Sequence, residues 1–68
     1  MHIQATDNAA MMAGYTRPVL IDIQHGSVAA LVRPDQDFDD AFPCFDTDNQ
    51  EWLTINGWLI DNIEDLEG

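Results

Sequence analysis

The chain has no lysine, and its only two cations, Arg17 and Arg33, lie in its first half. A sequence so poor in basic side chains predicts no direct binding to nucleic acid or to an anionic membrane. The single cysteine, Cys44, excludes a disulfide within the chain and suits a reducing compartment. No apolar run approaches the length of a membrane span, and the N-terminus lacks the pattern of a signal peptide. We therefore expect a cytoplasmic protein.

The length of 68 residues predicts one small domain with a marginal core. An apolar content of 46% argues against disorder in spite of the net charge of −11. We assign residues 1–16 to a partly ordered N-terminal tail and residues 17–68 to a single acidic β-rich domain. Within the tail, residues 2–6 suit a short strand and residues 9–13 a short helix ended by Gly14, and a frayed segment is the alternative.

The segment 18–24 is rich in β-branched residues and predicts a strand, which the turn 25–27 connects to a returning strand at 28–33. A further short strand is expected at 42–45. Pro43 would keep that strand at an edge of the sheet, because proline cannot donate a hydrogen bond to a neighbouring strand.

Asn56-Gly57 lies between two apolar segments, 51–55 and 58–60. This dipeptide is typical of a tight hairpin, because both central residues of a type I′ turn need a positive φ. Strict alternation would place Trp52 and Thr54 on one face of the first strand. We expect at least one of the two tryptophans to pack in the core.

The segment after residue 60 changes its period, since Leu59, Ile63 and Leu66 would share one face of a helix. We therefore predict a short C-terminal helix, with a continued strand as the alternative. The fold class expected is β-rich α+β, a small antiparallel sheet or half-open barrel of about 4–5 short strands.

Acidic residues dominate the second half of the chain, which holds eleven of the thirteen carboxylates and no cation after Arg33. Solubility alone is served by mixed charge, so a field of one sign indicates a basic partner. The candidate partner-binding residues are Trp52 and the acids Asp35, Asp37, Asp39, Asp40, Asp46, Asp48, Glu51, Asp61, Glu64, Asp65 and Glu67.

The spacing of Asp35, Asp37 and Asp39 matches the first ligands of a calcium-binding EF-hand loop. The rest of that pattern fails, because the position that needs glycine is Asp40 and the position that needs a bidentate glutamate is Asp46. We therefore predict no metal site and no cofactor. In an extended segment the same three carboxylates would form a row with about 6.6 Å between neighbours, comparable to the phosphates of a nucleic-acid strand.

In its small size and acidity the chain resembles the proteins that phages and other mobile elements use against host nucleic-acid machinery, such as anti-CRISPR and antirestriction proteins. The resemblance implies an inhibitor that occupies the basic nucleic-acid-binding surface of a host protein or complex. The alternative is a small homo-oligomeric accessory or adaptor protein, such as a homodimer, with an aromatic interface and acids that serve only solubility.

Enzymatic activity is not expected. The sequence contains no Ser-His-Asp order, no glycine-rich phosphate loop and no Cys-x-x-Cys pair, so we assign no catalytic residue. His25 is explained by its turn, and Cys44 by burial as a small hydrophobic side chain.

Overall fold

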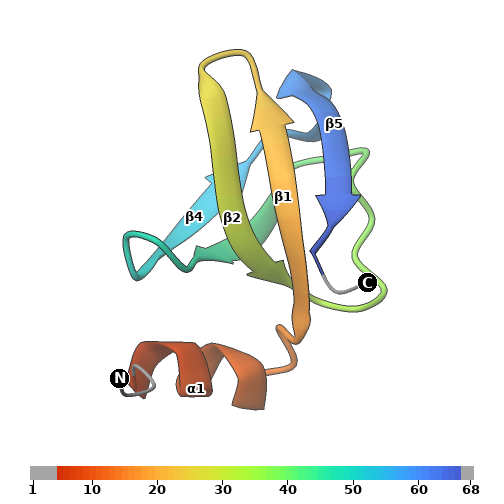
Figure 1. Cartoon of the computed structure of the whole chain (residues 1–68). Coiled ribbons are helices and arrows are strands. Elements are labelled where there is room, and N and C mark those ends of the chain that lie inside the picture. Colours follow the sequence, from red (N-terminus) through yellow and green to blue (C-terminus); the bar gives the residue numbers. More distant parts are fainter. Residues whose placement is uncertain (1–4, 67–68) are drawn as a thin grey trace.

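The structure, a computed structural model, describes residues 5–66, with the backbone alone for residues 5–7. It consists of one short helix and five antiparallel strands in a single open sheet (Figure 1). This arrangement confirms the expected small β-rich fold. In chain order the elements are α1 (Ala5–Met12), β1 (Arg17–Ile23), β2 (Gly26–Val32), β3 (Phe42–Asp46), β4 (Glu51–Ile55), the 3₁₀ turn η1 (Gly57–Leu59) and β5 (Ile60–Asp65).

The order of strands across the sheet is β4-β3-β2-β1-β5. The first four strands each pair with their neighbour in the chain, whereas β5 pairs with β1. The turn η1 therefore connects the two opposite edges of the sheet, and the long loop 33–41 connects β2 to β3. Figure 1 shows this loop (green) beside β5, far from the turn between β3 and β4.

The hairpin of β1 and β2 confirms the first predicted strand pair. Its register runs from Arg17 opposite Val32 to Ile23 opposite Gly26, so the turn lies at residues 24 and 25, slightly earlier than expected. Gly26 has a φ of 140°, which an L side chain rarely adopts. The glycine that follows this turn is therefore required by the backbone.

Strand β3 is an interior strand, so its prediction as an edge strand is wrong. It pairs with β2 only through Phe45 and Asp46, while Pro43 lies beyond these pairs and opposite Thr54 of β4. Pro43 thus stands where β3 has no paired neighbour on one side. A proline is tolerated there because no β2 carbonyl needs its missing N–H.

The predicted hairpin at Asn56-Gly57 is also wrong. Asn56 has a φ of −80°, and Gly57 is not among the glycines with positive φ. The glycine serves a close approach instead, because a Cβ at this position would overlap the carbonyl oxygen of Phe38 and lie 2.9 Å from the carbonyl carbon of Asp39. The chain therefore leaves β4 and passes against the backbone of the loop 33–41, at Phe38 and Asp39, to reach β5.

The predicted C-terminal helix is replaced by β5, as the alternative of a continued strand allowed. The register of β5 against β1 shifts, with Asp22 opposite Asn62 but Ile23 opposite Ile60, so Asp61 is an extra residue in a β-bulge. The bulge brings Ile60 and Ile63, three positions apart, to the same core. The spacing of three between these apolar residues is also found along one face of a helix.

The core lies on one face of the sheet and includes Phe42, which is 1% exposed, and Cys44, which is fully buried. A smaller cluster lies on the other face, where Ala10 and Tyr15 cover Leu31 and Phe45. Helix α1 contributes Ala10, so it closes one end of this second face (Figure 1).

Of the strand considered at residues 2–6, the first three residues lie outside the described part of the chain and the last two belong to α1. The described residues contain no helix with the length and apolar content needed to cross a membrane.

Candidate acidic interaction surface

The acidic loop, residues 35–40, is held by its own hydrogen bonds in a folded conformation. The backbone N–H of Gln36 donates to the carbonyl of Arg33 over 3.1 Å, and the N–H of Asp39 donates to the Asp37 carboxylate over 2.9 Å. The side-chain amide of Gln36 also donates to the Asp37 carbonyl, over 2.8 Å. The loop is therefore not the extended row of carboxylates that the sequence suggested, and Asp37 is committed partly to the turn.

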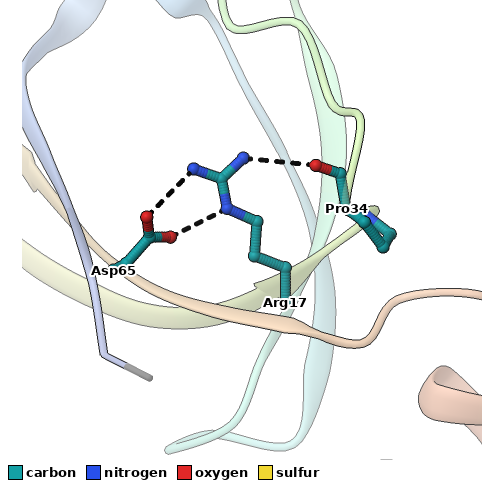
Figure 2. Close-up of polar contacts among 3 residues, drawn as sticks. All are labelled: Arg17, Pro34 and Asp65. Carbon is teal, nitrogen blue, oxygen red and sulfur yellow. Dashed lines mark hydrogen bonds and ion pairs between the residues drawn. The ribbon is translucent and has the colours of Figure 1, made fainter. Parts of the chain in front are cut away.

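Arg17 joins the beginning of this loop to strand β5 (Figure 2). Its guanidinium donates to the Asp65 carboxylate through Nε at 2.8 Å and through Nη2 at 3.3 Å. Nη1 donates to the carbonyl of Pro34 at 3.4 Å. The hydrogen bond from Arg17 lowers the pKa of the Asp65 carboxyl. The exposed ion pair between Arg17 and Asp65 contributes little stability, but the bonds of Arg17 fix the loop beside β5.

Phe38 anchors the middle of the loop. Its ring packs against the core and lies edge-on to Phe42, with 5.1 Å between the ring centroids. The Arg17 guanidinium also lies over the Phe38 ring, 5.6 Å from the ring centroid. Together with the close approach of Gly57 to the backbone of Phe38 and Asp39, these contacts hold the acids in fixed positions.

Most of the predicted partner-binding acids are exposed, and they form two separate groups. The first, which we call the acidic edge, joins the acidic loop to β5 and consists of Asp35, Asp37, Asp39, Asp40, Asp61 and Asp65. Glu64 lies opposite Leu20 and belongs to the other face of the sheet. The second consists of Asp48 and Glu51 at the turn between β3 and β4. Arg17 thus joins the loop to Asp65 of β5, although the two segments are distant in sequence, while Glu67 lies outside the described residues.

Asp46 does not belong to this surface. It is 5% exposed and accepts hydrogen bonds from the backbone N–H groups of Asp48 at 2.9 Å and Asn49 at 3.2 Å, and from the Asn49 side chain at 2.9 Å. Burial raises the pKa of Asp46, but the bonds from Asn49 and Asp48 outweigh burial and lower it overall. Asp46 therefore organises the turn between β3 and β4 from inside, and its prediction as a partner-binding residue is not supported by its position.

Both tryptophans are exposed, so the expectation that at least one packs in the core is wrong. Trp52 is 51% exposed and lies edge-on to Tyr15 and Phe45, with centroids 5.0 and 5.1 Å away. Its side chain lies on the same face of β4 as that of Thr54, as strand alternation predicted. Trp58, which sequence reasoning left out of the candidate site, is 77% exposed on η1. Its chain neighbour Gly57 touches the backbone of Phe38 and Asp39, a tertiary contact that no local pattern signals.

Cys44 is buried, as predicted, and His25 lies in the turn between β1 and β2. Burial, and then the nearby Asp46 carboxylate, raise the pKa of the Cys44 thiol to about 11. A thiol that is neutral and fully covered is a poor nucleophile. Within residues 5–66, no group of three or more histidine, cysteine or acidic side chains is placed to hold a metal ion.

Calcium and magnesium are expected to stabilise the protein equally. At millimolar concentration either cation screens the repulsion among carboxylates, and neither has a dedicated set of ligands on the acidic loop. The measurement is the melting temperature with each chloride salt at equal ionic strength. A rise of several degrees with calcium alone would show that Asp35, Asp37 and Asp39 form a selective site.

The arrangement is suited to electrostatic recognition. It combines a fixed loop, the adjoining edge strand β5 and the exposed Trp58. Within the described residues the one ion pair is that of Arg17 with Asp65. No protein-family model, curated protein or solved structure matches the chain.

Proposed function

We propose that this protein is an inhibitor that occupies a basic nucleic-acid-binding surface of a host protein, with its acidic edge in the place of the phosphates. The observation that carries the proposal is the union of the acidic loop and β5 into one surface without a free cation. Arg17 lies at this surface, but it is held by Asp65 and the carbonyl of Pro34. The resulting negative potential attracts a basic partner and repels nucleic acid itself.

The fixed conformation of the loop supports this function. A flexible acidic segment would lose conformational entropy on binding, whereas the contacts of Phe38, Gly57 and Arg17 hold the acids before the partner arrives. The acids do not need to reproduce bases, because most affinity for nucleic acid comes from phosphate contacts and counterion release. The single buried thiol fits a reducing compartment, so we place the encounter in the cytoplasm.

Reversing two charges of the acidic edge is expected to abolish partner binding. The variant Asp40→Lys with Asp61→Lys changes two exposed side chains that form no hydrogen bond with any described residue, so the fold is retained. The control is Asp48→Lys with Glu51→Lys, which changes the net charge equally at the other end of the sheet. Each single ion pair contributes about 0–1 kcal/mol, but a group of them on one surface also governs the rate of association.

The assay has two steps. Proteins retained by the immobilised wild-type chain, but not by the Asp40/Asp61 variant, are identified by mass spectrometry. Each is then bound to its labelled nucleic acid, and the wild-type chain is added as competitor. Displacement should be strong at low salt and weaken steeply as salt rises. Retained proteins that bind no nucleic acid, or equal retention by the Asp40/Asp61 variant, would contradict the proposal.

A second candidate function, a homo-oligomeric adaptor, is favoured by the exposure of Trp52, Trp58 and Leu66, of which the first and last are each 51% exposed. Apolar side chains of this size are the usual anchors of protein interfaces. Sedimentation analysis separates the two functions. An adaptor would form oligomers that persist at high salt, whereas an inhibitor of basic surfaces would remain a monomer when alone, since identical chains of net charge −11 repel each other.

A further inference from the structure

Trp58 is an exposed aromatic side chain beside the acidic edge. It belongs to η1, in which the preceding residue, Gly57, touches the backbone of Phe38 and Asp39. Two residues after η1 the chain reaches the bulged Asp61. No ring contact, cation–π contact or hydrogen bond joins Trp58 to any described residue. The indole ring is therefore available to a partner.

The protein's own arginines show which group such a surface binds. Arg17 lies over the Phe38 ring, 5.6 Å from its centroid, and its guanidinium also contacts the Asp65 carboxylate at 2.8 Å. Arg33 lies over the Tyr15 ring at 5.2 Å. Each guanidinium in the chain is thus held against an aromatic face, and the one at the acidic edge is held by a carboxylate as well. Trp58 offers an aromatic face without a cation, next in the chain to the glycine that touches the backbone of Asp39 and three residues before Asp61. Indole is the strongest cation–π partner among the aromatic side chains.

We propose that Trp58 is an arginine-binding position, at which a guanidinium of the partner stacks on the indole while carboxylates of the acidic edge supply the opposite charge. The inference rests on the proposed function and adds the chemistry of the partner, which is an arginine-bearing surface rather than a lysine-bearing one. Arginine is planar and weakly hydrated, so it stacks on a ring more readily than an ammonium group does.

A second copy of this chain does not fit the position. Two copies repel each other through a net charge of −11 each. The only two arginines of the chain already lie over Phe38 and Tyr15, so a second copy would have to give up one of these contacts. The occupant is therefore a different, basic protein.

The test uses a fluorescein-labelled oligoarginine and an oligolysine of equal length, with affinity measured by fluorescence anisotropy at low salt. The wild-type chain should bind oligoarginine about tenfold more tightly than oligolysine. Trp58→Ala should lower the affinity for oligoarginine by about the same factor and remove the preference, whereas Trp58→Phe should retain part of it. The control is Trp52→Ala, which removes the other exposed indole, on β4 at the opposite edge of the sheet from β5, and should leave the preference unchanged.

The outcomes separate this inference from the proposed function. If both peptides bind wild-type chain equally, or Trp58→Ala keeps the preference for oligoarginine, the role of Trp58 is refuted and the electrostatic function stands. If neither peptide binds at low salt, both proposals fail. Circular dichroism of every variant shows that a loss of affinity is not a loss of fold.

Discussion

Gly57→Ala is expected to lower the free energy of unfolding by about 2 kcal/mol, and Gly57→Val by about 3 kcal/mol or more. A Cβ at this position would overlap the Phe38 carbonyl oxygen and stand 2.8 Å from the Phe38 carbonyl carbon, and the obstructing atoms are backbone. The loop cannot yield by turning a side chain, so either the acidic loop or η1 must move. Urea denaturation followed by circular dichroism measures the loss.

Asn56→Ala is the matched control for this prediction. A tight hairpin at Asn56-Gly57 would need positive φ at both residues, and alanine at either would be strained. In the structure Asn56 has a φ of −80° and its side chain makes no capping bond, so alanine should change stability by less than about 0.5 kcal/mol. If Asn56→Ala proves as costly as Gly57→Ala, the segment is a hairpin turn and the path of the chain described here is incorrect.

Asp46→Ala is expected to cost about 2–3 kcal/mol at neutral pH. The substitution leaves two backbone N–H groups and the Asn49 side-chain amide without the carboxylate that accepts their hydrogen bonds. Asp46→Asn should cost less, because its carbonyl oxygen can still accept the two backbone bonds. In asparagine an amide nitrogen replaces the second carboxylate oxygen, and this nitrogen cannot accept the hydrogen bond from the Asn49 side chain. Part of the loss in stability therefore remains.

The contribution of Asp46 should also depend on pH. Its pKa is lower in the folded state than in the unfolded chain, so its stabilising effect is complete above the unfolded pKa of about 3.9 and disappears as pH falls through the folded value. The difference in unfolding free energy between wild type and Asp46→Asn should therefore shrink in acid. Asp48→Asn, with an exposed side chain, is the control, and its unfolding free energy should match that of wild type at neutral and at acid pH. A difference that is constant with pH would show that the Asp46 charge is not involved.

The local parts of the fold could be predicted from the sequence. The β1–β2 hairpin is encoded by adjacent β-branched segments and by Gly26, whose φ of 140° requires glycine. Phe42, Phe45 and Cys44 are buried, as apolar residues of a short strand should be. These features depend on neighbours in the chain, so pattern and propensity suffice to find them.

The second half of the fold could not be predicted, because distant contacts override its local signals. Asn-Gly has the composition of a tight turn, yet Gly57 is required by the backbone of Phe38, nineteen residues earlier in the chain. The apolar period of three in β5 comes from a bulge at Asp61 and not from a helix. Both errors concern residues whose partner lies far away in sequence.

The sequence shows which acids are candidates for the site but not how they are arranged. Counting charges could not show that Asp46 is buried beneath a turn or that Asp65 pairs with Arg17. The exposure of Trp58 was missed because large aromatic residues in a small domain are usually buried. A surface formed by a loop and an edge strand exists only after β5 has paired with β1.

The pairing of β5 with β1 determines when the protein can finish folding. Val19 lies opposite Asp65, so the fifth strand closes a loop of more than forty residues, and pairings of such high contact order form late. During synthesis β1 keeps one unpaired edge until residues 60–65 have left the ribosome. The β1–β4 meander is then an incomplete sheet, open to pairing with other chains. The acidic edge assembles only when this late step is complete, so a nascent chain has no complete acidic edge.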